Sequence, residues 1–353
     1  MFRVLIVWLF LHTTLVVFAS HVMGGEITYK HLGAGNYQFE LVFYRDCNGA
    51  DVNAVSENLR VWNHPSLSVI PVLFVQRQDL SPSCTQVPGG ASPLLCGTGN
   101  NGGNGIGAIE KVIYRSAPIA LSGTPPAQGW AFTYENFSRS GALTNLSNPS
   151  TYGITLVAKI FNLAQPDDSP IFNEDPNFVS CAGLPYQYNA AVSDANLDSL
   201  HFEFGVPYDH FPVGSYNPPS NPAPIPFVSG FSAASPTPGT SVNASNIPAV
   251  LNPLNGNLTF TSFTIGNYAL KIVVKAYRAG VLISETEREM QLVLQPCNSS
   301  NFPPIIAPPF AAGSSYELTV NAGDLIDVPL LITDPDTQSN GSLQNITLEA
   351  QLP

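Results

Sequence analysis

Acidic and amide side chains recur at alternate positions in one short stretch of the sequence, at Asp194, Asn196 and Asp198. Their oxygens are ligands that calcium prefers, and a protein site collects about six to eight oxygens around the ion. The same side chains also close turns by accepting hydrogen bonds from nearby backbone amides, without any metal. We therefore expect a plain acidic turn and keep calcium as the alternative. Asp334 and Asp336 follow a similar predicted strand and form a second candidate of this kind.

The five cysteines form no zinc motif, because none are spaced as CxxC and none cluster with histidine. In an exported chain they are expected to form disulfides. Cys181 and Cys297 lie just inside the two ends of a predicted domain, and we expect them to pair. Cys84 and Cys96 bracket a Pro- and Gly-containing loop and are the second expected pair. The odd count leaves at least one cysteine without a partner in this chain.

One enzymatic alternative depends on His21. If a signal peptide were cleaved after Ser20, this histidine could chelate copper through its amine and ring, with His64 or His210 as a further ligand. That arrangement is typical of a copper-dependent polysaccharide oxidase. A dinucleotide site is not expected at "GTGNNG" (residues 97–102), because more Gly and Asn follow it rather than a helix. GxSxG is absent, so we expect a protein that is not an enzyme and bears no cofactor other than calcium.

The elements that must position these residues read as strands. Tyr37, Phe39, Leu41 and Phe43 alternate with more polar residues, as in a half-buried strand. The chain contains 32 Pro and 28 Gly, and these residues join strands by turns and loops. "KIVVKAYRAGVLISETEREMQLVL" predicts a long hairpin that turns at Ala279 and Gly280. The sequence therefore predicts an all-β fold.

Composition shifts divide the chain into four segments. Residues 1–19 have the charged start and apolar core of a signal peptide, and no later segment is apolar enough to span a membrane. Residues 20–163 form an expected N-terminal β-domain, and 164–297 an immunoglobulin- or cadherin-like β-sandwich. Residues 298–353 read as the start of a further, truncated domain of that kind. The expected architecture is tandem β-sandwiches behind a signal peptide.

The charge balance narrows the class of partner. The chain has 13 Lys and Arg against 25 Asp and Glu, for a formal net charge of −12. Nucleic acids and anionic lipids attract basic surfaces, so neither is an expected partner.

Three stretches resemble one bacterial family: "SHVMGGEITYKHLG", "YQFELVFYRDCNG" and "AYRAGVLISETERE". They are similar to secreted surface proteins of Bacteroidetes-type bacteria, which are gliding-motility-associated and exported by the type IX system. The resemblance covers nearly the whole chain. It implies immunoglobulin- or cadherin-like repeats, a location at the bacterial cell surface and an adhesive role, with no catalytic residues to transfer.

The chain departs from the family at three points. The family often has cysteines before the arginine that matches Arg139, but Phe137 and Ser138 stand here, so Cys47 is expected to have lost its partner. The family's acidic loop usually reads D-x-D-G-D, which Asn196 interrupts. The sequence also ends without the C-terminal sorting domain, so we expect a truncated gene or a partial sequence.

These observations predict a secreted, adhesin-like protein that binds an extracellular protein or polysaccharide surface. One alternative is a carbohydrate-binding module of a larger secreted assembly, with Trp62 or Trp130 exposed to sugars, although strand tryptophans more often pack inward. The other alternative is the copper oxidase built on His21.

Overall fold

The computed structural model describes residues 22–52, 54–81, 94–137, 139–162, 166–297, 304–310, 318–321 and 323–334. These residues form two units, one ending at Gln295 and the other beginning at Pro296. About half of the chain is strand, 48%, and a single 3-10 turn, Pro149–Thr151, is seen among the described residues. The all-β prediction is confirmed.

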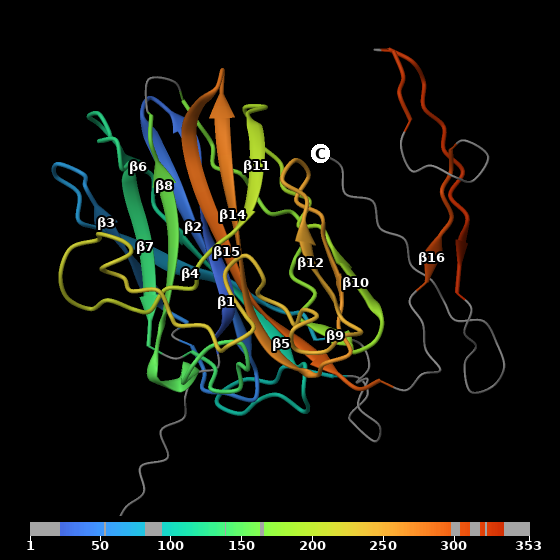
Figure 1. The fold of residues 1–353 in the computed structure, drawn as a ribbon. Helices are drawn as coiled ribbons and strands as arrows, with labels where there is room; N and C mark the ends of the chain where they lie inside the picture. Colours follow the sequence, from blue (N-terminus) through green and yellow to red (C-terminus); the bar gives the residue numbers. More distant parts are fainter. Residues whose placement is uncertain are drawn as a thin grey trace, which may run out of the picture. The chain divides into compact units, whose positions relative to one another are not determined.

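The first unit is built on one large sheet (Figure 1). Its strands follow the order β1-β2-β5-β4-β3-β7-β8-β15-β14-β11, with β6 beside β2 and β9 beside β15. Their bounds are β1 (Val22–Gly33), β2 (Asn36–Asp46), β3 (Ser56–Trp62), β4 (Val69–Asp79), β5 (Ile109–Ser116), β6 (Ile119–Ala120), β7 (Trp130–Asn136), β8 (Ile154–Ile160), β9 (Val179–Cys181), β11 (Ser199–Phe204), β14 (Gly266–Arg278) and β15 (Val281–Gln295). A smaller sheet, β10-β13-β12, contains β10 (Pro185–Tyr188), β12 (Ile247–Leu251) and β13 (Leu258–Thr261).

The strand β15 joins the two halves of this unit. One of its edges pairs with β14 along its length. The other edge pairs in turn with β8 at residues 284–286, with β1 at 288–290 and with β9 at 293–295. Because β1 meets β15, the strand path closes on itself. Figure 1 shows β15 running between β14 and β1.

Among its described residues, the structure therefore has no domain boundary at residue 163, where the sequence led us to expect one. Residues on both sides of it belong to one compact unit and share one sheet. The physical reason is the length of β15, whose 15 residues accommodate three successive partners on one edge. Separate tandem sandwiches are not what this unit shows, whereas the expected boundary near residue 297 falls beside the observed one at 295/296.

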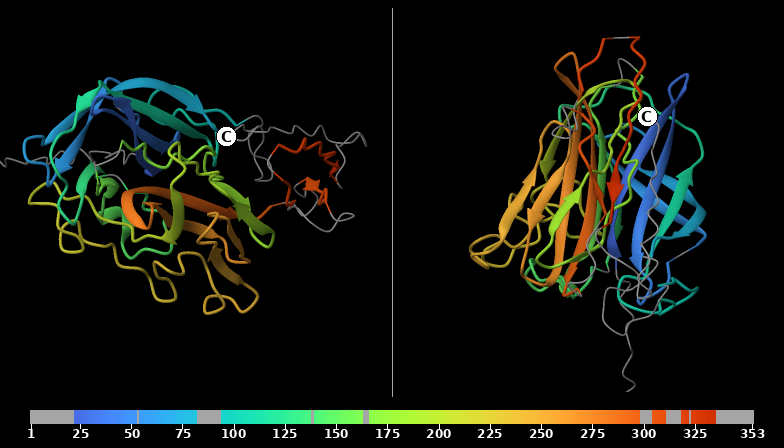
Figure 2. Two further views of the ribbon diagram at one scale, coloured as in Figure 1. Left: turned by 90° about the horizontal axis from the view of Figure 1, so that it is seen from above. Right: turned by 90° about the vertical axis from the view of Figure 1, so that its right-hand side faces the viewer.

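Two hydrophobic cores lie on the two faces of β1 and β2. Phe39, Leu41 and Phe43 point into the first core with β3, β4, β7 and β8, as the alternating pattern predicts. Val42 and Tyr44 point the other way, into a second core with β14, β15 and the smaller sheet. The strand predicted to be half-buried is thus buried on both faces over residues 41–45. Figure 2 shows the corresponding layers from above.

Two glycines allow β1 to enter this crowded junction. A Cβ at Gly24 would lie 1.9 Å from the backbone oxygen of Glu289, and one at Gly25 would lie 2.4 Å from that of Val42. Gly24 also has a φ of +138°, which other residues rarely adopt. The Gly-Gly pair therefore allows the backbones of β1, β2 and β15 to approach closely.

The second unit contains a short antiparallel pair among its described residues, β16 (Ile305–Ile306) with β17 (Ile332–Thr333). Leu325 and Leu330 are exposed, with 96% and 45% of their surface accessible. The expected third sandwich stays a prediction. Residues 1–21, which contain the expected signal peptide and His21, lie outside the described part of the chain.

Candidate acidic site

The acidic stretch after β10 forms the turn that the sequence predicts. The Asp194 Oδ1 atom accepts hydrogen bonds from the backbone amides of Asn196 (2.9 Å) and Asp198 (3.0 Å). Leu197 completes the turn with a positive φ of 61°. The alternating Asp and Asn residues thus close a tight loop that leads directly into β11.

Asn196 faces a different group from the two aspartates. Its Oδ1 atom accepts a 2.8 Å hydrogen bond from the backbone amide of Asp168. That segment is itself fixed to β1, because the Asp168 carboxylate accepts from the His31 amide and the Ser169 hydroxyl oxygen accepts from the Tyr29 amide. The amide of Asn196 therefore anchors the connection that follows β8.

This connection brings a third carboxylate to the turn. Single oxygens of Asp167, Asp194 and Asp198 lie within 4.8 Å of one another. The hydroxyl of Tyr29 also donates to Asp167, over 3.3 Å. Asp167 was not predicted as part of this site, because it lies 27 positions before Asp194 in the chain. The available signal was the Pro- and Asp-rich stretch "QPDDSP", which reads only as a domain boundary.

Arg278, the last residue of β14, is the basic group that contacts these carboxylates. Its guanidinium binds both oxygens of Asp198, at 2.6 and 2.7 Å, and one oxygen of Asp167 at 2.7 Å. Such bidentate geometry is the strong form of an arginine–carboxylate pair. The Arg278 side chain is 22% exposed, whereas the side chains of Asp167 and Asp198 are nearly fully buried.

Burial raises the pKa of two of the three carboxyl groups. Removal from water, reinforced by a hydrogen bond with Asp198, raises the pKa of Asp167 to about 7. Burial also raises the pKa of Asp194. The Asp194 Oδ2 atom is buried and has no hydrogen-bond partner among the described residues. The raised pKa values favour the protonated carboxyl groups, and only when all three are ionised does the site hold three negative charges beside its one arginine.

The prediction for the second acidic pair stays a prediction. Asp334 belongs to the second unit, and Asp336 lies outside the described residues. The structure thus brings together two of the predicted residues, Asp194 and Asp198, with a third that was not predicted.

The disulfide prediction for Cys96 is wrong in its partner. Cys96 is bonded to Cys47, with an S–S distance of 1.98 Å and a Cα–Cα distance of 5.4 Å. Cys47 has therefore not lost its partner, and Cys84, expected to pair with Cys96, lies outside the described residues. The antiparallel pairing of β2 with β5, together with the loop before β5, places these two sulfur atoms side by side. Cys181 and Cys297 are each disulfide-bonded.

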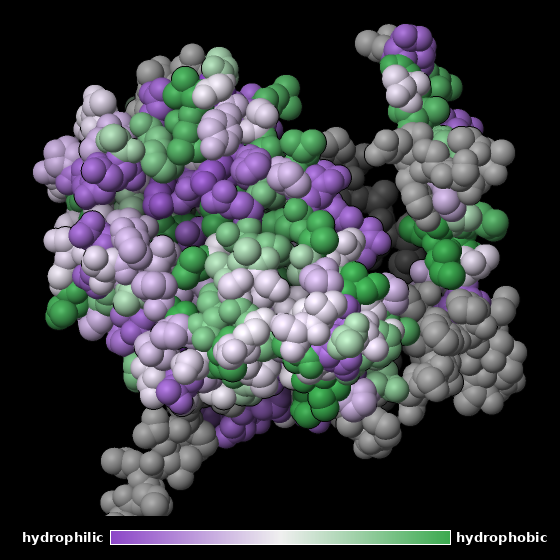
Figure 3. Space-filling view, in the orientation of Figure 1, coloured by the Kyte–Doolittle hydropathy of each residue, from purple (hydrophilic) through white to green (hydrophobic). Residues whose placement is uncertain are grey.

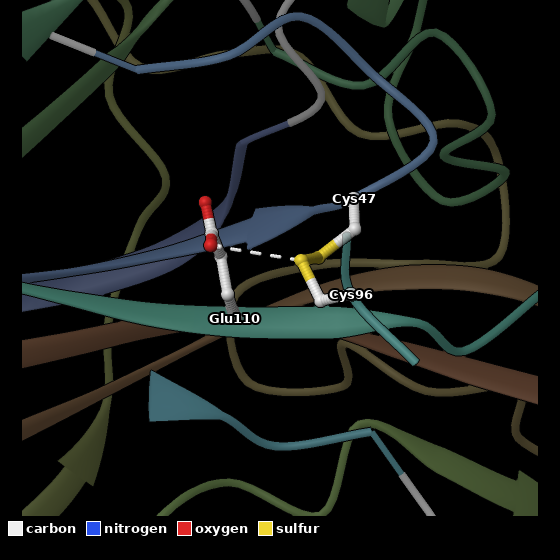
Figure 4. Close-up of side chains that lie close together, drawn as sticks. All are labelled: Cys47, Cys96 and Glu110. Atoms are coloured by element: carbon white, nitrogen blue, oxygen red, sulfur yellow. Dashed lines mark hydrogen bonds between the residues drawn. A yellow bond between two sulfur atoms is a disulfide. The ribbon is translucent and has the colours of Figure 1, made fainter. Parts of the chain in front are cut away.

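A second cluster of possible ligands surrounds this disulfide. Figure 4 shows Glu110 on β5 directed toward it, with its Oε2 atom 3.6 Å from the Cys96 sulfur. Because both sulfur atoms are in a disulfide, neither is a thiolate able to bind metal. Glu110 is instead paired with Arg45 at 2.7 Å and with Arg77 at 3.2 Å. This cluster is structural.

Buried ion pairs also line β15, where the sequence reads as polar. Glu285 pairs with Lys159, Glu287 with Lys271 and Arg288 with Glu26, at 2.7, 2.9 and 2.6 Å. Glu289 pairs with Arg139. The sequence analysis did not identify these partners because they come from four other segments of the chain.

The tryptophans considered for sugar binding and the histidine His64 considered for copper binding make contacts within the protein. Trp130 is fully buried, and Trp62 is covered by the Arg60 guanidinium, 4.2 Å from its ring. The His64 Nδ1 atom accepts hydrogen bonds from the backbone amides of Ser66 and Leu67. The inward packing expected for Trp130 is confirmed.

A cavity of about 400 Å³ lies elsewhere in the first unit, near the start of β1 and of β5. Its walls include Met23, Ile109 and Val293, and its polar groups include Asn267 and Gln291. The Gln291 Oε1 atom has no hydrogen-bond partner among the described residues.

No protein-family model, curated protein or solved structure matches the chain. Within the described residues, no helix has the length and apolar character needed to cross a membrane.

Proposed function

We propose that this chain is a non-enzymatic, exported protein of the bacterial surface that acts as an adhesin-like component. Disulfide bonding carries the extracellular part of this proposal. Cys47 and Cys96 form a disulfide, and Cys181 and Cys297 are also disulfide-bonded. Disulfides persist in secreted and surface proteins and are rare in reducing compartments.

The use of charged residues supports a scaffold rather than a catalyst. The charged side chains along β15 and around Glu110 are largely buried and form ion pairs with one another. Pairs of this kind fix β-strands in register, because removing one partner leaves the other charge buried and unpaired in the core. The charges in the interior thus serve to hold the two halves of the unit together.

Exposed hydrophobic side chains around β12 offer a contact surface. Each of the following is more than half exposed: Ile247, Val250, Leu254, Phe263 and Ile265. Figure 3 shows hydrophobic residues interspersed with polar ones over this face. Among the described strands, β12 pairs with β13 alone, so its other edge presents backbone groups. Exposed apolar edges favour contact with another surface.

Binding by the immobilised mature chain tests this proposal. We expect saturable binding to an extracellular protein or polysaccharide in a panel of both, unaffected by removal of copper. The double variant Ile247→Asp with Val250→Asp should weaken binding, whereas Val281→Asp, similarly exposed at a hairpin turn, should not. Release of oxidised oligosaccharides that requires copper and a reductant would instead establish the oxidase alternative.

A carbohydrate-binding module is the second candidate, and the cavity beside Gln291 favours it. Sites for small ligands have volumes of about 300–1,000 Å³, with apolar walls and a few polar groups. The unpartnered Gln291 oxygen can accept a hydrogen bond from a sugar hydroxyl. Calorimetry with a monosaccharide panel tests this candidate. Saturable binding that Gln291→Leu abolishes would support it, and no heat of binding from any sugar would exclude it.

A further inference from the structure

We infer that Asp167, Asp194 and Asp198 bind a divalent cation of calcium's kind, with Arg278 as the counter-ion that holds the site when no metal is bound. This inference is independent of the proposed adhesive role. It differs from the calcium ligands suggested by the sequence in one essential respect, because Asp167 replaces Asn196.

The first argument is the balance of buried charge. The three carboxylates are each at least nine-tenths buried, with exposed fractions of 1%, 8% and 8%. The one basic side chain bonded to them in the described structure is Arg278. Once the pH exceeds the raised pKa of Asp167 and all three are ionised, the group has three negative charges against one positive. Buried charge without a partner is costly, so such a group favours uptake of a further cation.

The second argument is the orientation of Asp194. Its Oδ1 atom is fixed by two backbone amides, which sets the direction of the carboxyl group. The Oδ2 atom is left buried with no hydrogen-bond partner. Buried polar atoms are usually satisfied, so this oxygen is available to a cation held by the neighbouring carboxylates.

The spacing of the oxygens fits one ion. Calcium binds oxygen at about 2.3–2.6 Å, so two ligands of the same ion lie no more than about 5 Å apart. One oxygen from each of the three aspartates lies within 4.8 Å of the others. Calcium accepts irregular geometry and completes its shell with backbone oxygens and water, whereas magnesium demands a near-ideal octahedron. Calcium is therefore the ion to test at this site.

Arg278 determines how tightly the ion binds. Its guanidinium bonds both oxygens of Asp198, so a cation must share that carboxylate or displace the arginine. The arginine is partly exposed and precedes the hairpin turn at Ala279 and Gly280, where a Cβ on Gly280 would meet nothing within 4 Å. Because the guanidinium is already partly exposed, a cation can displace it toward solvent.

Calorimetric titration of the chelator-treated mature chain with Ca²⁺ tests the inference, together with the melting temperature at each concentration. We expect one saturable site and a melting temperature that rises with Ca²⁺, because the ion binds the folded state. Asp194→Asn keeps the Oδ1 acceptor of the turn but removes the charged ligand, and should weaken binding at least about tenfold, equal to about 1.4 kcal/mol. Glu203→Gln, an exposed carboxylate on β11 outside the cluster, is the matched control and should bind as the wild type does.

Arg278→Gln provides a second comparison. Removing the competing guanidinium should tighten Ca²⁺ binding severalfold and make folding more dependent on the ion. Absence of saturable binding by the wild type at millimolar Ca²⁺ would overturn the inference. Equal affinities for the wild type and Asp194→Asn would overturn it as well, and this comparison holds even if Arg278→Gln fails to fold.

Discussion

Gly24 lies directly against the backbone of Glu289, at the point where β1 meets β15. The contact joins the first strand of the unit to the last one, across 265 positions of sequence. This close contact leaves no space for a side chain at position 24. The two cores lie on either side of β1 and β2, which have one face in each core.

Substitution of Gly24 by alanine should therefore destabilise the whole first unit. The added Cβ would meet the Glu289 oxygen at 1.9 Å, and the positive φ would be strained as well. We expect the free energy of unfolding, measured in urea, to fall by more than about 3 kcal/mol. Gly239→Ala is the control, because its nearest neighbours are 3.8 Å away, and it should change stability by no more than about 1 kcal/mol. Equal effects of the two changes would refute the close crossing.

Removal of the Lys271 charge should destabilise the first unit far more than removal of the Lys275 charge on the same strand. Lys271 is fully buried between Glu287 and Glu289. Lys271→Met would remove the hydrogen-bonded cation of Glu287, whereas Glu289 would keep its pair with Arg139. We expect a loss of about 3–5 kcal/mol in the free energy of unfolding. Lys275→Met removes a partly exposed pair with Glu203 and should cost no more than about 1 kcal/mol. A Lys271→Met protein as stable as Lys275→Met would contradict a structural role for the buried pairs.

The disulfide between Cys47 and Cys96 closes a loop over 49 positions. In the chain-entropy account, a loop of this length contributes about 4 kcal/mol. The double variant Cys47→Ser with Cys96→Ser should lose much of this stability. Reduction of the wild type, which also breaks the disulfide bonding of Cys181 and Cys297, should lower the stability at least as far. A double variant with an unchanged urea midpoint would show that the bond does not constrain the unfolded chain.

Peptide mapping without reduction should recover Cys181 linked to Cys297, as their places at the two ends of a predicted domain suggest. Both are disulfide-bonded in the structure. The same digest should contain Cys47 linked to Cys96 and no peptide that links Cys84 to Cys96. Recovery of Cys181 or Cys297 as a free thiol would contradict this prediction.

Local patterns predicted the strands well. The alternation through Phe39, Leu41 and Phe43 identified a buried face correctly, and the long hairpin turns at Ala279 and Gly280 as expected, with Arg278 opposite Val281. These features depend on residues close together in sequence. Strand periodicity and turn chemistry are sufficient to reveal them.

Relationships between distant segments were not predictable in the same way. The stretch from Ser284 to Glu289 is polar in sequence, yet it is buried because β1, β8 and β14 all pair with this part of β15. Asp167 joins the acidic turn only because its segment is held on β1. Cys47 meets Cys96 because β2 pairs with β5. In each case the deciding contact depends on strand order, which periodicity does not specify.

Native-state amide hydrogen exchange of the mature chain tests most directly whether residues 22–295 form a single unit. The amides of β7 and β8, before the expected division, should open with the same free energy as those of β14 and β15 after it. Their dependence on denaturant should also be the same, because one sheet joins them. If β7 and β8 opened in a separate, lower-energy transition while β14 and β15 stayed protected, the two halves would be independent domains and the shared sheet would be contradicted.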